Sequence, residues 1–544
     1  MTFVQVFLYL AGIPGLTPVF AAGTVEARFL YEDRVFAATG WTGALVELPI
    51  RGARAVLENG SGVSLDVKTT GEDGGVTFTH PGSGSQLVRV RVEARHPEGW
   101  FRVARNSGST YSAVSALTTY DLDGGAVIEV VALYRDNGQR SVGGAFNIYD
   151  ILLSGFTMLR ELDAALAFPA LTAYWEVGSL DGTYYSSNAL HILGGSDDTD
   201  EYDDAIIAHE FGHYVSDAFS RDESPGGQHY LNQEYRLTLS WSEGMAHYLS
   251  SLFRGTPVHF DSYGDVDYLG FNLEEASVRD EARDNFAVAP GAACELRVAA
   301  ALWDCTDPID DDPIQIPATD FWTLFHLDIP AMPSPINMES FFLAWRARWG
   351  ARADWPDFPA TLAGQSIFYF SDGLEQNNKV ADATDVAAGA RAGTLTLFDA
   401  GDEDWFSVPV VAGGRYVFRT HDLHNGADTV LTLWNESATS KLAENDNSGE
   451  RDALGRLLGN SRIGWTADRT GSVRLQVRHV TTTYSARYGS YLLSAYRSAD
   501  FDGDNDVDED DLAAAAAARP DFDLDGRRDY RDWFELAVHR LSGP

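Results

Sequence analysis

Cysteine and lysine are both scarce in this sequence. Only two of the 544 residues are cysteine, Cys294 and Cys305, and only three are lysine, at positions 68, 379 and 441. If the stretch CELRVAAALWD is one helix, eleven positions separate the two cysteines by about 16 Å, which is too far for a disulfide. We therefore expect two free thiols, at least one of them buried. Core burial and metal ions would then hold the fold together.

Positive charge is also in short supply. The chain carries 80 acidic against 40 basic residues, a formal charge of −40. Such a chain is repelled by nucleic acid and by anionic membranes, so we expect no partner of these two classes. The surplus of carboxylates fits calcium sites, a solubilising surface or a salty habitat, and composition does not separate these three.

Long apolar runs are missing beyond the N-terminus, so no transmembrane segment is expected. Residues 1–23 have no charge, and their apolar stretch ends in small residues. This pattern predicts a signal peptide, cleaved after Ala21 or after Gly23, although the usual basic start is absent. We expect a secreted protein, extracellular or associated with the cell surface.

The remaining chain divides by pattern into several domains, as its length requires. Residues 24–125 alternate apolar and polar residues between glycine-rich turns, as in QLVRVRVEA, which predicts β-strands. This region resembles the carboxypeptidase-regulatory-like β-sandwich of many secreted proteins. Helical spacing then begins with GGAFNIYDILLSGFTMLREL, and helices dominate to about residue 350. LTAYWEV and NALHILGG read as strands within this second region, residues 126–370.

The stretch IIAHEFGHYV, residues 206–215, carries the central chemistry. In a helix, His209 and His213 point the same way and can present two imidazoles to one metal ion. Glu210 projects about 100° away from His209, where it can address a water on that ion. Asp203 or Asp204 can cap the start of the helix. A buried helix that happens to contain two histidines is the alternative.

A hydrolytic zinc site needs a third protein ligand and an open position for water. The three-histidine pattern fails, because Phe219 stands where its third histidine would be. Thirty residues after His213, the helical stretch LSWSEGMAHYLSSLF supplies Glu243 instead.

These two motifs together resemble the secreted bacterial gluzincins, zinc metallopeptidases related to fungalysin and thermolysin. The resemblance implies zinc ligands His209, His213 and Glu243, with Glu210 as the general base toward a zinc-activated water. It also implies that NALHILGG is the edge strand that pairs with a substrate peptide. His229 is our first candidate to stabilise the oxyanion, followed by Tyr263 or Tyr268. Cys294, Glu295 and the helix after them are most simply read as core.

Residues 371–497 show short strands separated by turns and resemble the bacterial pre-peptidase C-terminal β-sandwich. That resemblance implies a calcium site of four residues: Glu375, Asn377, Asp402 and Asp404. Ordinary polar turns are the alternative reading of these residues.

The last segment, residues 498–544, contains two twelve-residue loops rich in aspartate, a spacing typical of EF-hand calcium sites. They resemble the two loops of a type I dockerin. Cohesin docking is one expectation, and a free-standing calcium-folded tail is another. The predicted calcium ligands are Asp500, Asp502, Asp504, Asp508, Asp511, Asp521, Asp523, Asp525, Asp529 and Asp532.

The sequence therefore predicts a multidomain protein: an α+β gluzincin-type metallopeptidase core, flanking β-sandwich domains and a small dockerin-like α tail. The predicted activity is a secreted zinc endopeptidase that cleaves extracellular proteins, with Zn2+ and Ca2+ as cofactors. A non-catalytic surface or scaffold protein built on a decayed peptidase fold is the alternative.

Overall fold

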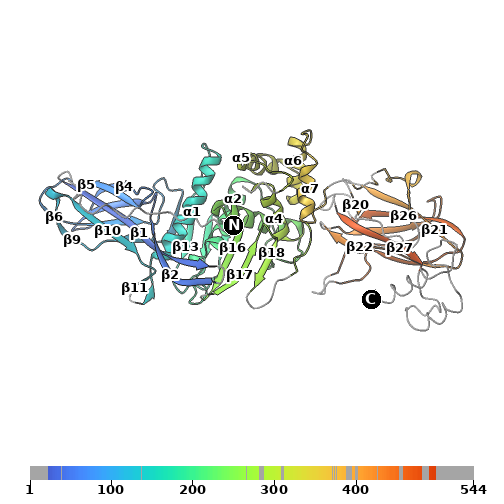
Figure 1. The fold of residues 1–544 in the computed structure, drawn as a ribbon, viewed down its shortest axis with the longest axis horizontal. Coiled ribbons are helices and arrows are strands. Elements are labelled where there is room, and N and C mark those ends of the chain that lie inside the picture. Colours follow the sequence, from blue (N-terminus) through green and yellow to red (C-terminus); the bar gives the residue numbers. More distant parts are fainter. Residues whose placement is uncertain are drawn as a thin grey trace. The chain divides into compact units, whose positions relative to one another are not determined.

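The computed structural model describes residues 23–37, 40–136, 138–264, 266–280, 287–307, 312–369, 372, 374, 376–386, 395–397, 402–424, 427–451, 457–480 and 489–497. The side chains of 266–269 and 278–280 are outside this description. The chain forms two compact units, Met1–Phe211 with Phe260–Tyr268, and Gly212–His259 with Leu269–Pro544. The protein is multidomain and rich in β-sheet, with several helices (Figure 1).

The first unit is built mainly of sheets. Its helical elements are η1 (Leu122–Gly124), α1 (Gly143–Leu162) and η2 (Asp200–Tyr202). Its strands are β1 (Thr24–Ala37), β2 (Gly40–Pro49), β3 (Arg54–Asn59), β4 (Ser64–Thr69), β5 (Gly75–Thr79), β6 (Ser85–Glu93), β7 (Phe101–Ala104), β8 (Ser112–Val114), β9 (Thr118–Asp121), β10 (Ala126–Ala132), β11 (Arg135–Asp136), β12 (Gln139–Arg140), β13 (Leu171–Trp175), β14 (Tyr184–Ser186) and β15 (Ala189–Ile192). The limits between the units fall inside α2 (Asp204–Phe219), β16 (Val258–Tyr263) and β17 (Val266–Asn272).

Periodicity explains why these segments form these elements. From Val88 onward, every second residue of β6 is buried, as expected for a strand with one face on a core. The predicted helix at 143–162 coincides with α1, which buries Phe146, Leu152 and Phe156. Hydrogen bonding crosses the predicted domain limit at residue 125, because β10 pairs in parallel with β1 from Val25↔Ala126 onward. The limits of the N-terminal sandwich stay a prediction.

One expectation about the sheets is wrong. The segment NALHILGG contains β15, which lies between β14 and β13 in a sheet of order β14-β15-β13-β7 and so is not an edge strand. Ser187 and Asn188 both have positive φ, 53° and 60°, the conformation of a two-residue hairpin turn. This turn folds β14 back onto β15 and covers the edge that was expected to be open.

The second unit contains the other helices and the C-terminal strands. Its helical elements are α3 (Leu237–Arg254), α4 (Glu295–Asp304), α5 (Ala318–Thr323), the π-helical turn η3 (Leu324–Asp328), η4 (Ile329–Ala331), α6 (Met338–Trp349), α7 (Asp357–Gly364) and η5 (Val380–Asp382). Its strands are β18 (Ser277–Asp280), β19 (Thr384–Asp385), β20 (Leu395–Thr396), β21 (Glu403–Val410), β22 (Arg415–His424), β23 (Thr429–Trp434), β24 (Lys441–Asn445), β25 (Arg462–Thr466), β26 (Gly471–His479) and β27 (Ser490–Arg497).

The C-terminal strands form two facing sheets, of order β19-β21-β26-β23-β24 and β20-β27-β22-β25. Phe406 and Leu475 from the first sheet share one core with Phe418 and Tyr491 from the second. The prediction about the cysteines is confirmed: Cys294 and Cys305 flank α4, and both are free and buried. None of the helices in the described ranges combines the length and the apolar character needed to cross a bilayer.

Candidate metal centre

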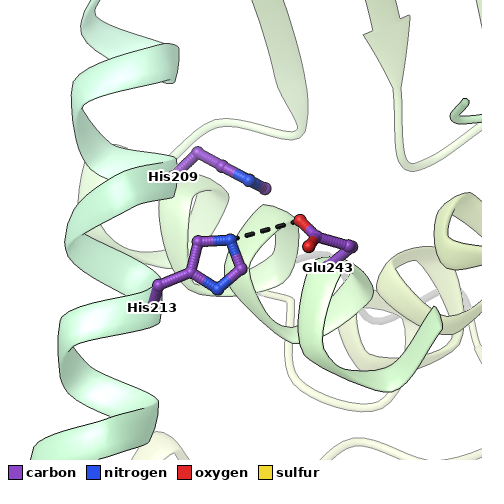
Figure 2. A group of neighbouring side chains, drawn as sticks. All are labelled: His209, His213 and Glu243. Atoms are coloured by element: carbon purple, nitrogen blue, oxygen red, sulfur yellow. Dashed lines mark hydrogen bonds and ion pairs between the residues drawn. The ribbon is translucent and has the colours of Figure 1, made fainter. Parts of the chain in front are cut away.

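Helix α2 carries the two histidines of the HEFGH motif. It begins after Asp203, whose backbone oxygen accepts from the amides of residues 206 and 207. Asp203 and Asp204 stand at this start, and their carboxylates accept hydrogen bonds from Ser262 and Asn147 respectively, so side-chain capping of the helix stays a prediction. His209 and His213 are four positions apart, so helix geometry places them on one face, one turn apart (Figure 2).

Helix α3 supplies the carboxylate. Glu243 is 8% exposed, and its Oε2 lies 3.2 Å from Nε2 of His213. In Figure 2 the two histidines project from one helix toward Glu243 on another. One ligand atom from each of His209, His213 and Glu243 lies within 4.8 Å of the other two. The structure thus brings together the three residues that the sequence predicts as zinc ligands.

Glycine allows these helices to approach closely. A Cβ atom on Gly212 would lie 2.9 Å from both the Cα and the carbonyl oxygen of Ala246 on α3. A Cβ on Gly244 would lie 2.7 Å from the carbonyl oxygen of Glu295 and 2.7 Å from Val298 Cβ, both on α4. Real Cβ atoms do not approach backbone this closely. The small residues next to the ligands therefore set the spacing of α2, α3 and α4.

His229 lies in the irregular segment between α2 and α3, and its ring joins two carboxylates. Nδ1 lies 2.8 Å from Glu295 Oε2, and Nε2 lies 3.6 Å from Glu243 Oε1. Burial opposes a charge on His229, but the hydrogen bond to Glu295 and the charge of that carboxylate outweigh it and raise the pKa of His229. Tyr263, by contrast, is 51% exposed on β16, and the side chain of Tyr268 is outside the described residues.

Glu295 is a residue whose role the sequence analysis missed. It is on a core helix, as expected, but its carboxylate contacts two imidazoles: His229, and His247 Nε2 at 3.8 Å. Burial alone would raise the pKa of Glu295, and the hydrogen bond from His229 together with the nearby imidazole of His247 lowers it below its usual value. No local spacing links position 295 to position 229, so only the folded chain reveals this contact.

A second group of carboxylates was also missed. Within the described ranges, Asp198, Asp200 and Asp261 have oxygens within 4.8 Å of one another. Burial, followed by the charge of Asp198, raises the pKa of Asp261 to about 7. Burial also raises the pKa of Asp200 to about 8, although Thr183 donates a hydrogen bond to it. The sequence shows an acidic segment at 196–204, but it does not show that Asp261 returns to it.

The predicted calcium sites stay predictions. Glu375 and the ten aspartates between positions 500 and 532 lie outside the described residues. In the C-terminal sandwich, Asn377 and Asp404 are buried, at 1% and 2% exposure. With its amide oriented to satisfy both partners, Asn377 donates to Asp404 Oδ1 at 3.1 Å, and the Tyr491 hydroxyl donates to Oδ2 of the same carboxylate. Asp402 directly precedes β21, two positions before Asp404.

Comparison with protein families gives a match over part of the chain. The model of the Mycolysin C-terminal domain matches residues 162–354, a segment that contains His209, Glu210, His213 and Glu243. This match indicates a protease-related domain and fits the context of a secreted bacterial metallopeptidase. No curated protein matches the chain.

Three solved structures each align with 21% of this chain. The pre-peptidase C-terminal domain of the Bacillus anthracis collagenase is 16% identical, with 93% of that chain covered and a TM-score of 0.16. PliG of Aeromonas hydrophila, a periplasmic inhibitor of g-type lysozyme, is 15% identical, with 95% covered and a TM-score of 0.14. PliG of Salmonella Typhimurium is 18% identical, with 98% covered and a TM-score of 0.14.

Proposed function

We propose that this protein is a secreted zinc-dependent metalloendopeptidase that hydrolyses peptide bonds of extracellular proteins. The observation that carries the proposal is the convergence of His209, His213 and Glu243, whose ligand atoms lie within 4.8 Å of one another. Two imidazole nitrogens and one carboxylate oxygen form the donor set that suits catalytic zinc, with a coordination position left for water or substrate. The residues present therefore fit this metal.

The protein's own residues would divide the remaining work. Bound zinc would polarise the scissile carbonyl and make water acidic enough to lose a proton near neutral pH. Glu210 follows His209 on α2 and is 8% exposed. From this position beside a proposed ligand, its carboxylate would accept the proton of the water and return it to the leaving amine. His229 has Nε2 directed at Glu243 and can donate a hydrogen bond to the carbonyl oxygen as its charge develops.

The test compares zinc content and casein cleavage in the wild-type protein and Glu210→Gln. We expect both proteins to bind one zinc per chain, because Glu210 is not a ligand. We expect the variant to lose activity by a factor of about 100 or more, as for removal of a general base. Glu161→Gln, an exposed glutamate on α1, is the matched control and should keep full activity.

The same experiment separates the alternative function. If the wild-type protein binds zinc stoichiometrically but cleaves casein no faster than Glu210→Gln, the peptidase proposal fails. A non-catalytic scaffold on a decayed peptidase fold would give that result.

A further inference from the structure

A single buried carboxylate connects two histidines beside the candidate metal centre. Glu295 is 1% exposed and stands at the first position of α4. One of its oxygens lies 2.8 Å from His229 Nδ1, and the other lies 3.8 Å from His247 Nε2 on α3. The three side chains come from an irregular segment and two helices, so the cluster exists only in the folded chain.

The contact with Glu295 fixes the direction of the other ring nitrogen. The two nitrogens of an imidazole are distinct, and a hydrogen bond at one sets the orientation of the other. With Nδ1 held by Glu295, Nε2 of His229 lies 3.6 Å from Oε1 of Glu243. The ring therefore points at a candidate zinc ligand, although its side chain is still 30% exposed and solvent is within reach.

The backbone around His229 has little regular structure to hold the ring in place. Residues 221–230 form no helix or strand. Gly226 and Gly227 have positive φ, 62° and 122°, and a Cβ on either would meet nothing within 4 Å. The anchor on the other side is rigid by comparison, because Gly244 packs α3 directly against the backbone of Glu295. The position of the ring thus depends on the side-chain bond to Glu295.

We propose that Glu295 is a positioning residue, which holds His229 with Nε2 directed toward Glu243 and the metal position, and that His247 steadies the second carboxylate oxygen. The expected effect on kcat rests on the proposed peptidase function, whereas the expected effect on the orientation of the His229 ring rests on the geometry alone. Glu295 touches neither substrate nor metal here, and it acts through His229.

The kinetic test is a double-mutant cycle with Glu295→Leu and His229→Ala, measuring kcat, KM and zinc content. Displacing a catalytic group by about 1 Å can cost on the order of 100-fold in rate, and a partly displaced ring costs less, about 10- to 100-fold. We expect Glu295→Leu to lower kcat by that factor, with KM and zinc content close to wild type. Because Glu295 acts through His229, adding Glu295→Leu to His229→Ala should change kcat less than threefold.

Two further variants make this test sharper. Glu295→Gln keeps a hydrogen-bond acceptor, so its kcat should lie between those of the wild type and the leucine variant. Glu274→Leu is the matched control, since this carboxylate accepts from Trp303 near the other end of α4 and should leave kcat unchanged. Equal losses from Glu295→Leu in the wild-type and His229→Ala backgrounds would overturn the proposal. Loss of zinc in His229→Ala would make His229 a ligand and would also overturn it.

A second measurement does not depend on activity. In the zinc-free protein labelled with 15N-histidine, the ring signals of His229, assigned by their absence in His229→Ala, report the hydrogen bond at Nδ1. We expect a protonated Nδ1 in the wild type and a changed Nδ1 signal in Glu295→Leu, with the Glu274→Leu spectrum unaltered. Unchanged His229 signals in Glu295→Leu would refute the positioning role. If casein is never cleaved while the signals change as expected, the proposed function fails and the positioning contact stands.

Discussion

Substituting Gly212 by alanine should weaken zinc binding at the proposed metal centre without unfolding the protein. The new Cβ would lie 2.9 Å from both the Cα and the carbonyl oxygen of Ala246. Carbon atoms pack best at about 3.5 to 4.0 Å, so α2 and α3 must separate by roughly 0.6 to 1 Å. Both contacted atoms are backbone, so no side-chain rotation relieves the clash.

The cost in stability is expected to be modest. Overpacking of this kind typically costs about 1 to 3 kcal/mol. Alanine is favoured over glycine inside a helix by about 1 kcal/mol, which offsets part of that cost. We therefore expect a net loss of about 0 to 2 kcal/mol in the free energy of unfolding, measured by urea denaturation.

The effect on zinc should be much larger than the effect on stability. His213 is adjacent to Gly212 on α2, and Glu243 is on α3, so a change in helix separation changes the distance between these two proposed zinc ligands. Metal–ligand distances are held to about 0.2 Å, several times less than the expected shift. We expect zinc affinity, measured by competition with a chelator, to fall at least about tenfold.

Two controls distinguish this mechanism from general damage. Gly364→Ala places a Cβ at the end of α7, where nothing lies within 4 Å, and should leave zinc affinity unchanged. Adding Ala246→Gly to the Gly212→Ala variant should not restore binding, because the clash is with the backbone of residue 246. Wild-type zinc affinity in Gly212→Ala, or rescue by Ala246→Gly, would refute the role given to this helix crossing.

Three other outcomes follow from buried groups in the second unit. Burial raises the pKa of Asp304 to about 8, so the folded state holds a proton that the unfolded chain releases near pH 4. The contribution of Asp304 to the free energy of unfolding therefore falls as pH rises from about 4 to 8, by at most about 1.4 kcal/mol per pH unit. Asp304→Asn should remove this dependence, as measured by urea denaturation at several pH values. Burial raises the pKa of Cys294 to about 11 and that of Cys305 further, so neither thiol should react with a disulfide reagent until the protein is denatured, when two equivalents should appear. Phe358 stacks on Trp345 with ring centroids 3.8 Å apart, and Phe358→Ala should cost about 3 to 5 kcal/mol of unfolding free energy.

The sequence predicted best what depends on local periodicity. The helical spacing of apolar residues located α1 over its full length, and the alternation at 86–94 located β6. These patterns are read within a single element, because each element buries one face of its own. The same locality explains why the spacing of His209 and His213 predicts that they share one helix face, whereas their shared metal ion rests on the resemblance and stays a prediction.

What the sequence could not predict depends on pairing between distant segments. The resemblance implied that the segment NALHILGG is an edge strand, and the hairpin turn at Ser187 and Asn188, which has no glycine to mark it, gave no sign of the covering strand. The partnership of Glu295 with His229 joins positions 66 residues apart. A carboxylate at the start of an apolar helix is interpreted as a residue that stabilises the helix terminus. The residues next to Glu295 in the sequence give no indication that its partner is the distant His229.

The small residues next to the proposed ligands matter as much for the site as the ligands themselves. An HExxH pattern places two imidazoles on any helix, but a third ligand from another helix reaches them only if the two backbones come close enough. Here Gly212, within the first motif, packs against the backbone of Ala246, within the second, and Gly244, next to Glu243, packs against the backbone of Glu295. Larger residues at these positions would push the helices apart. His209, His213, Glu243 and Glu295 would then still be present in the sequence, but their side chains would no longer lie close together. The positions of the small residues are therefore part of the sequence motif, because they allow α2, α3 and α4 to approach closely enough for their side chains to meet.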